Sequence, residues 1–403
     1  MRGTSQQAQV GVVGADRVEG PLKGNHHRTF AVRVDASSAL AKEFRWLKLR
    51  EPRDGVLWYD MRWFPSEDVV LRLLRDRFGD AVRRVPRVCE QQVQAGPPPV
   101  LIALIQFIEG ATLDRVRGGR AGRVAERFLR QIEELFAALA SIDADRFVEY
   151  GSPAVDGCAD CNLAAYPEHG GSSQFLSRLL HFTFSHAYDQ QRQDMDGLLT
   201  DLGVPPEKLA EFAERRPELT DRPRKLLHGD LHRKNFVVDR AGGLWTIDWE
   251  LALVGDPLYD LATHLHLMGY PADQEAEVIA CWERAVGPDA AAGARADLPH
   301  YRAYKRVQSL CTDVLRATAR LTAADAAEVE TSADGGVAAG SSTAGPAATP
   351  ARRRGAPERL RAAAVVVGRA LEAARPHLEL DKTLPLPAVE LALQAFLQRT
   401  GRR

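Results

Sequence analysis

A segment near the middle of the chain places three polar side chains at fixed intervals between short apolar runs. Asp230, Asn235 and Asp248 stand within LLHGDLHRKNFVVDRAGGLWTIDWE, residues 226 to 250. The apolar residues on either side predict short β-strands, so the polar residues fall on the loops that join those strands. A lone Asp or Asn in a loop usually caps the backbone, but three at such spacing indicate a shared chemical site.

Phosphoryl transfer to a hydroxyl group requires a set of this kind. One carboxylate orients the attacking hydroxyl and accepts its proton, while an amide oxygen and a second carboxylate hold Mg²⁺ against the phosphates. The Asp, the Asn five residues later and the Asp further on follow the order known for kinases.

The same segment resembles the aminoglycoside phosphotransferase family, which shares the protein-kinase fold. The resemblance rests on HGDLHRKN followed by IDWELALVGDPLYDLA and covers residues 228 to 262. It implies that Asp230 is the catalytic base and that Asn235 and Asp248 are Mg²⁺ ligands. It also implies that Asp256 braces the catalytic loop.

Other residues of the segment have plainer interpretations. His228 is expected to pack and to hydrogen-bond without reacting. His232 either contacts a substrate or is a solvated loop residue, and both readings stay open. Asp256 and Asp260 are expected to have structural rather than catalytic roles.

The first hundred residues predict strands, turns and one helix. The alternation FAVRV at 30 to 34 predicts a strand, and FRWLKL at 44 to 49 predicts another. A helix is expected to begin at Ser66, a plausible N-cap. The continuous apolar run at 100 to 105 is typical of a buried strand.

Lys48 lies in the second of these strands and Glu67 opens the helix. This order resembles the lysine–glutamate pair of the family, in which the lysine holds the α- and β-phosphates and the glutamate aims it. Lys42 is the competing lysine, although it precedes the strand and is expected at the surface. Glu67 also has a simpler explanation, as a negative charge at a helix N-terminus.

Weaker signals concern the rest of the nucleotide. Gly20 and Gly24 flank a predicted hairpin tip, where backbone amides can approach phosphates, but a plain turn explains them equally well. Gln106 and Ile108 follow the buried strand, where the family has the interlobe hinge whose backbone binds adenine. An ordinary strand end is the alternative.

The remaining chain predicts helices and one low-complexity stretch. Apolar residues between 128 and 139 recur at helical spacing. We therefore predict an α+β, two-lobed protein-kinase-like fold: a small β-rich nucleotide-binding lobe over residues 1–105 and a mostly helical lobe over 106–330. Residues 331–357 lack large apolar side chains and are predicted to be a disordered linker. C-terminal helices are expected within 358–403, over 358–374 and 388–398.

Composition excludes several classes of protein. A net charge of −1 argues against binding to nucleic acid through overall charge. No apolar run is long enough for a membrane span or a signal peptide. Five cysteines, few and scattered, fit a cytoplasmic protein with free thiols. Cys158 and Cys161 form a single CxxC pair without the further ligands that a structural zinc site needs.

These features predict a kinase that uses ATP and Mg²⁺ to phosphorylate a hydroxyl group of a small molecule, with an antibiotic as one candidate. Acidic residues between 187 and 201 fit a pocket for a polycation, and a solvated helix face explains them equally well: Asp189, Asp194, Asp196 and Asp201. The alternative is a nucleotide-binding pseudokinase that regulates a protein partner. A protein kinase is disfavoured by HGD in place of HRD and by the absence of an APE segment. The acceptor and the oligomeric state stay open.

Overall fold

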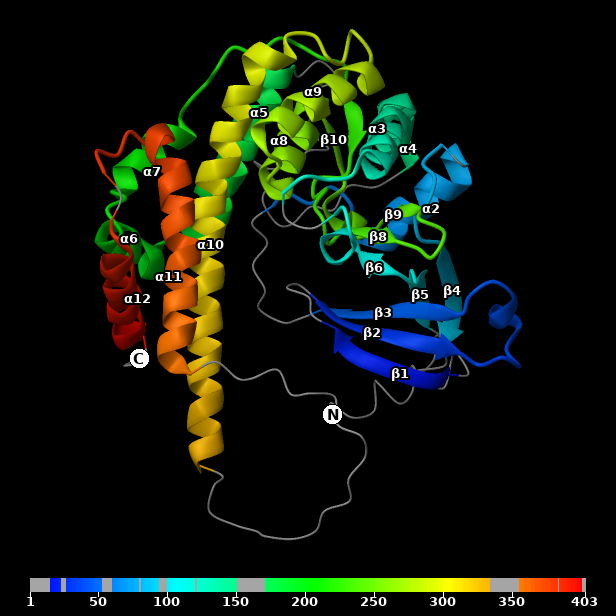
Figure 1. Cartoon of the computed structure of the whole chain (residues 1–403), viewed down its shortest axis with the longest axis horizontal. Helices are drawn as coiled ribbons and strands as arrows, with labels where there is room; N and C mark the ends of the chain where they lie inside the picture. Colours follow the sequence, from blue (N-terminus) through cyan, green and yellow to red (C-terminus); the bar gives the residue numbers. More distant parts are fainter. Residues whose placement is uncertain are drawn as a thin grey trace. The chain divides into compact units, whose positions relative to one another are not determined.

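The computed structural model describes residues 15–22, 27–52, 60–79, 81–93, 100–119, 122–150, 171–333, 355–382 and 384–400 (Figure 1). The chain divides into two compact units. The first contains residues 1–176 and 218–301, and the second contains residues 177–217 and 302–403. Both sides of residue 105 belong to the first unit, so the lobe boundary predicted there stays a prediction.

The N-terminal part of the first unit is a five-stranded sheet in the order β1-β2-β3-β5-β4, with every neighbouring pair antiparallel. Its strands are β1 (Ala15–Leu22), β2 (His27–Val34), β3 (Trp46–Pro52), β4 (Val88–Val93) and β5 (Val100–Gln106) (Figure 1). The predicted alternation in β2 is confirmed, because Phe30, Val32 and Val34 all enter the core of the sheet. A short 3-10 helix, η1 (Ala39–Lys42), precedes β3.

Helix α2 (Glu67–Phe78) follows and lies against β4 and β5. It begins directly after Ser66, as predicted, although the Ser66 side chain makes no capping hydrogen bond. The helix buries Val70, Leu71 and Leu74, and it also buries Glu67 at its first position. A charged side chain buried at a helix start is costly unless it is paired, so this position indicates a specific role.

The rest of the first unit is mainly helical and carries two small sheets. Its helices are α3 (Glu126–Ser141), α4 (Ala144–Tyr150), the start of α5 (Ser172–His181), α8 (Pro257–Met268), α9 (Ala272–Val286) and the start of α10 (Ala294–Ala333). One small sheet pairs β6 (Ala111–Thr112), β8 (Phe236–Val238) and β9 (Leu244–Thr246), and the other pairs β7 (Lys225–Leu227) with β10 (Leu253–Gly255). Two short 3-10 helices complete this part, η2 (Leu113–Arg115) and η7 (Trp249–Leu251). Helix α3 confirms the predicted apolar spacing, since its buried residues are those expected: Phe128, Leu129, Ile132, Leu135, Phe136 and Leu139.

The second unit contains short helices and the C-terminal pair. Its elements are the π-helix η5 (Phe182–Ala187), η6 (Asp189–Gln191), α6 (Arg192–Asp201), α7 (Pro206–Ala213), the rest of α10, α11 (Ala356–Ala374), η8 (Arg375–His377) and α12 (Leu386–Thr400). The two C-terminal helices are within two residues of their predicted limits. Helix α12 packs on α11 and on α6, where Arg399 pairs with Asp201 at 2.8 Å.

The predicted linker is helical at both ends. Helix α10 continues to Ala333 and α11 begins at Ala356, while residues 334–354 lie outside the described part of the chain. A small antiparallel β-rich part followed by a mostly helical remainder confirms the predicted α+β class. Among the helices of the described ranges, none is both long enough and apolar enough to cross a bilayer.

Candidate active site

Residues 228–235 of the predicted segment form the loop between β7 and β8, which we call the catalytic loop after its predicted role. Gly229 in this loop has a φ of +79°, a conformation that favours glycine. A Cβ atom there would lie 2.4 Å from the carbonyl oxygen of Leu251, far inside van der Waals contact. The glycine of HGD is therefore required for the loop to turn next to the segment that follows Asp248.

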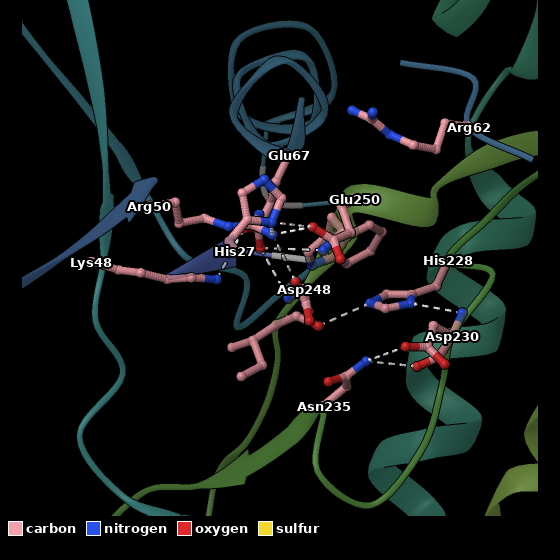
Figure 2. Close-up of polar contacts among 12 residues, drawn as sticks. His27, Lys48, Arg50, Arg62, Glu67, His228, Asp230, Asn235, Asp248 and Glu250 are labelled. Atoms are coloured by element: carbon pink, nitrogen blue, oxygen red, sulfur yellow. Dashed lines mark hydrogen bonds and ion pairs between the residues drawn. The ribbon is translucent and has the colours of Figure 1, made fainter. Parts of the chain in front are cut away.

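Asp230 and Asn235 lie side by side on this loop (Figure 2). The Asn235 side-chain amide donates to the backbone carbonyl of Asp230 at 2.9 Å and to its carboxylate at 3.0 Å. Because both bonds use the amide nitrogen, the amide oxygen of Asn235 stays available to a cation. The Asp230 side chain is 28% exposed, so a substrate can reach it.

His228 connects this loop to the residues before Asp248. It is fully buried, its Nε2–H donates to the carbonyl of Ile247 at 3.1 Å, and its Nδ1 accepts the Asp230 N–H at 3.3 Å. Its ring lies 4.6 Å from that of Trp249. Burial lowers the pKa of His228 to about 4, so the imidazole is neutral at pH 7. These contacts confirm the structural role expected for His228.

The brace of the catalytic loop is Asp260, not Asp256. Asp260 accepts the backbone N–H groups of His228 at 3.0 Å and Gly229 at 2.9 Å. Asp256 instead caps α8 through the N–H of Leu258 at 2.9 Å. The role that the family resemblance implied for Asp256 is therefore wrong, because its carboxylate is taken up at the start of α8.

Asp256 belongs to a separate buried ion-pair group. Arg222 donates to its carboxylate at 2.7 Å and the Tyr301 hydroxyl donates to it at 2.8 Å. Arg222 also pairs with Asp297 at the start of α10. This group joins α8 to α10 and holds the helical framework together.

Two further residues fix the catalytic loop, and sequence reasoning missed both. His264 on α8 donates from Nδ1–H to the carbonyl of Leu231 at 2.9 Å, and its Nε2 accepts the Tyr270 hydroxyl at 2.9 Å. Arg233 is buried and donates to the backbone carbonyls of Gly119, Gly122 and Met268. Leu231 is 33 residues from His264, and the partners of Arg233 are at least 35 residues away, so no local pattern could reveal these roles.

Asp248 follows β9 in a strained backbone conformation. Its φ of 68° and ψ of 60° lie in the left-handed region, where non-glycine residues are rare and where functional sites often store strain. Its side chain is 35% exposed. Partial burial raises the pKa of Asp248 above its ordinary value, against the opposing effect of Lys48, and the neighbouring carboxylates of Glu250 and Glu67 add to the rise. A cation at this carboxylate would stabilise its charged form.

Lys48 and Glu67 form the predicted pair. Lys48 Nζ lies 3.0 Å from Glu67 Oε2, which confirms this pairing (Figure 2). Burial alone would raise the pKa of Glu67, but the cations of Lys48 and Arg50 lower it below its ordinary value. The other oxygen of Glu67 accepts the N–H groups of Asp248 at 2.9 Å and Trp249 at 3.2 Å. The competing Lys42 is exposed in η1.

A buried ion-pair network extends this pair and was not predicted. Arg50 pairs with Glu67 at 2.6 Å, with Glu250, and with Asp248 at 3.5 Å. It also contacts His27 on β2, 2.8 Å from its Nδ1. The available signal was position, since Arg50 is two residues beyond Lys48 and so lies on the same face of the strand.

A hollow of about 390 Å³ lies next to the sheet. It is lined by Glu19, Ala31, Trp46, Phe107, Glu109, Gly110 and Arg240. Trp46 lies two residues before Lys48, and Ala31 pairs with Lys48 across the sheet, so the hollow adjoins the lysine. Trp46 was not predicted to be a site residue, although its position two residues before Lys48 on the same strand was a signal for it.

The weaker candidates for nucleotide contacts that the structure describes are Gln106, Ile108 and Gly20. Gln106 and Ile108 flank Phe107, which lines the hollow, and the Gln106 side chain accepts the N–H of Arg87 at 3.2 Å. Gly20 lies within β1, two residues before the strand ends at Leu22, at an irregularity in the pairing of β1 with β2. A Cβ on Gly20 would lie 2.9 Å from Phe30, so the glycine permits close strand packing. Gly24 lies outside the described residues.

The acidic stretch does not gather free carboxylates. Asp189 pairs with Arg192 at 2.8 Å, Asp196 accepts the Tyr188 hydroxyl at 2.6 Å, and Asp201 pairs with Arg399 at 2.8 Å. The side chain of Asp194 lies outside the described part of the structure. Each described carboxylate of the stretch already has a partner, which weakens the interpretation as a polycation pocket.

The described residues include three cysteines, of which Cys281 and Cys311 are free thiols. Across those residues, no group of three or more His, Cys, Asp and Glu side chains is arranged to hold a metal ion. Cys158 and Cys161 lie outside this part of the chain, so the expected absence of zinc there stays a prediction.

A family model described as the phosphotransferase enzyme family matches residues 18–304, well over half of the 403 residues. The chain belongs to the phosphotransferase enzyme family. This membership confirms the resemblance predicted from HGDLHRKN and IDWE. No curated protein matches this phosphotransferase.

Solved structures similar to this phosphotransferase include three from related enzymes. A thermostable mutant of aminoglycoside phosphotransferase APH(4)-Ia, in ternary complex with ADP and hygromycin B, has a TM-score of 0.46 at 16% identity over 77% of this chain and 92% of that chain. Macrolide 2'-phosphotransferase MphH from Brachybacterium faecium has a TM-score of 0.45 at 16% identity over 77% and 91%. A choline/ethanolamine kinase family protein from Mesorhizobium loti has a TM-score of 0.43 at 13% identity over 97% and 99%.

Proposed function

We propose that this phosphotransferase moves the γ-phosphoryl group of ATP to a hydroxyl group of a small molecule. The observation that carries the proposal is the contact between Asn235 and Asp230, in which the amide nitrogen orients the carboxylate and the amide oxygen is left for a cation. Asn235 can thereby connect Asp230, the proposed proton acceptor, with the proposed metal ion. His228 supports this arrangement by tethering the catalytic loop to Ile247, next to Asp248.

Asp230 acts on the acceptor. Its carboxylate orients the hydroxyl and takes its proton as the hydroxyl oxygen forms a bond to the γ-phosphorus. The bond between that phosphorus and the bridging oxygen breaks, and ADP leaves with the electron pair. The partial exposure of Asp230 supports this role, because the acceptor must reach the carboxylate from solvent.

The residues present fit Mg²⁺. The donor set consists of the Asn235 amide oxygen and the Asp248 carboxylate, both hard oxygen ligands of the kind that Mg²⁺ prefers. Mg²⁺ is usually held by one or two carboxylates together with substrate phosphates, so a small protein donor set is sufficient. When bound, Mg²⁺ neutralises charge on the phosphates. The partial exposure of Asp248 supports this assignment, because a cation can reach its carboxylate.

The nucleotide is proposed to lie along β3. Lys48 contacts the α- and β-phosphates and Glu67 aims it, while the base enters the hollow between Trp46 and Phe107. An aromatic wall suits a flat base, which can stack on it. The backbone of Gly20, Gly24, Gln106 and Ile108 stays a predicted source of further contacts.

The test is acceptor-dependent release of ADP from purified full-length protein. A panel of hydroxylated compounds should include aminoglycosides, macrolides, choline and homoserine, because an antibiotic is one candidate acceptor among several. ATP and GTP should each be tried as donor. We expect product with at least one acceptor, and transfer slower by roughly 10²- to 10⁴-fold in Asp230→Asn. A wild-type protein that binds nucleotide but phosphorylates nothing in the panel would favour a regulatory pseudokinase instead.

A further inference from the structure

Arg50 holds a position between the sheet and the segment that follows β9. Its side chain is 14% exposed, and its guanidinium pairs with Glu67 through Nη1 and with Glu250 through Nη2 (Figure 2). The Nη2 atom is also 3.5 Å from Asp248 and 2.8 Å from His27 Nδ1. One arginine on β3 thus contacts both a helix carboxylate and the proposed metal-binding segment.

Glu67 depends on more than one cation. Its side chain is 1% exposed, and a carboxylate so deeply buried is stable in its charged form only when it is paired. Both Lys48 and Arg50 approach the same oxygen, Oε2. In the proposed reaction Lys48 also turns to the phosphates, so part of its charge is shared with the nucleotide. Arg50 is the cation that can stay with Glu67 throughout.

Arg50 and Glu67 together hold residues 248–250 at two points. Glu67 Oε1 accepts the N–H groups of Asp248 and Trp249, and Arg50 binds the carboxylate of Glu250. Between these points Asp248 has its left-handed backbone, a conformation that persists only where the surroundings enforce it. The planar guanidinium can bridge two carboxylates at once, which a lysine ammonium on its flexible stem does poorly.

We propose that Arg50 is a positioning residue, which keeps Glu67 and the segment 248–250 in place so that Asp248 can hold the metal. The role rests on the proposed function. Two residues of β3 then have different roles. Lys48 acts on the nucleotide directly, whereas Arg50 acts on metal-dependent binding through Glu67 and Glu250. Arg50 itself contacts neither the nucleotide nor the metal.

The first test needs no nucleotide. Hydrogen exchange of the backbone amides of Asp248 and Trp249 is compared in wild type, Arg50→Lys, Arg50→Gln and Lys48→Met. Arg33→Met, an exposed arginine on β2, is the control. Exchange should be faster by about tenfold or more in both Arg50 variants, because they lose the bridge from Glu67 to Glu250 that Lys48 does not make. Lys48→Met and Arg33→Met should stay within about threefold of wild type.

Arg50→Lys keeps the charge and is the variant expected to fold most readily. Exchange at wild-type rate in folded Arg50→Lys and Arg50→Gln would overturn the proposal. So would equal acceleration in Lys48→Met, because the two cations would then act alike.

The second test measures ATP affinity by calorimetry with Mg²⁺ and with EDTA. The ratio of the two affinities should fall by about tenfold in Arg50→Lys, with metal-free affinity unchanged. Lys48→Met should lower both affinities by the same factor. Equal losses in Arg50→Lys would overturn the proposal, since Arg50 would then bind nucleotide directly. A wild-type protein that binds no nucleotide would contradict the proposed function, and the exchange experiment would still decide the role of Arg50.

Discussion

The side-chain amide of Asn235 donates hydrogen bonds to both the backbone carbonyl and the carboxylate of Asp230, at 2.9 and 3.0 Å. The residue proposed to hold the metal is therefore also the residue that orients the proposed base. A substitution at Asn235 can separate these two roles if it keeps an oxygen ligand and removes the N–H donor.

Asn235→Asp is such a substitution. It retains an oxygen for Mg²⁺ but places a second negative charge beside Asp230, and like charges at this distance disfavour the ionised base. We expect Mg·ATP affinity to stay within about threefold, while the transfer rate falls by roughly 10²- to 10⁴-fold, the usual contribution of a positioned general base. Calorimetry and ADP release measure the two quantities. Full transfer activity would show that the amide nitrogen does not position Asp230.

Asp260 and Asp256 should respond differently to the same change. Each oxygen of Asp260 accepts one amide of the catalytic loop, and Asp260→Asn replaces one of these oxygens with an N–H donor, so the transfer rate per folded molecule should fall about tenfold or more. Asp256→Asn breaks the buried pair with Arg222, which should lower the free energy of unfolding by about 3–5 kcal/mol. Its transfer rate per folded molecule should change less than that of Asp260→Asn. The reverse ranking of rates would restore the loop-bracing role to Asp256.

Trp46 should matter for the nucleotide base. Trp46→Ala removes an aromatic wall of the hollow, and stacking of a base on an aromatic ring contributes about 1–3 kcal/mol. We expect ATP affinity to fall by about tenfold or more, with the Mg²⁺ dependence of binding unchanged. Lys42→Ala in η1 is the control, because that side chain is exposed. Unchanged ATP affinity in Trp46→Ala would place the base elsewhere.

Stability should fall in mild acid because of His264. Burial lowers its pKa from 6.5 to about 4, so between these values the unfolded chain binds more protons than the folded protein. The contribution of neutral His264 to the free energy of unfolding is complete above pH 6.5. It is lost as the pH falls towards 4, by at most about 3 kcal/mol. Denaturant unfolding of wild type and His264→Gln should therefore converge as the pH falls, with exposed His300→Gln as the control. Parallel curves for wild type and His264→Gln would contradict the low pKa.

Local sequence patterns predicted helices and strands, but they could not predict which distant elements contact one another. The period of β2, the buried face of α3 and the start of α2 follow from residues a few positions apart. Between α5 and α6 the chain forms the π-helix η5, where the Tyr188 N–H donates to the carbonyl of Thr183. Such a π-helix depends on tertiary packing, which helix propensity does not report.

The site was predictable where one short segment carries it. A stretch of 19 consecutive residues contains Asp230, Asn235 and Asp248, so their spacing can be read directly from the sequence. Arg50 and Glu250 are 200 residues apart, and their contact exists only after the sheet meets the loop that follows β9. The choice between Asp256 and Asp260 depended on which carboxylate faces the catalytic loop, since both stand at the start of the same helix.

In the proposed reaction Asp230 acts on the acceptor and Asp248 holds the metal. Asp230→Asn keeps the size of the side chain but removes the base, so Mg·ATP affinity should change little while transfer falls by roughly 10²- to 10⁴-fold. Asp248→Asn removes an anionic oxygen ligand, so the Mg²⁺ dependence of nucleotide binding should weaken together with turnover.

The most direct measurement is Mg·ATP titration and acceptor-dependent ADP release for both variants in parallel. We expect Asp230→Asn to lose transfer alone and Asp248→Asn to lose metal-dependent nucleotide binding as well. Equal loss of Mg·ATP affinity in the two variants, or transfer at wild-type rate in Asp230→Asn, would contradict these separate roles.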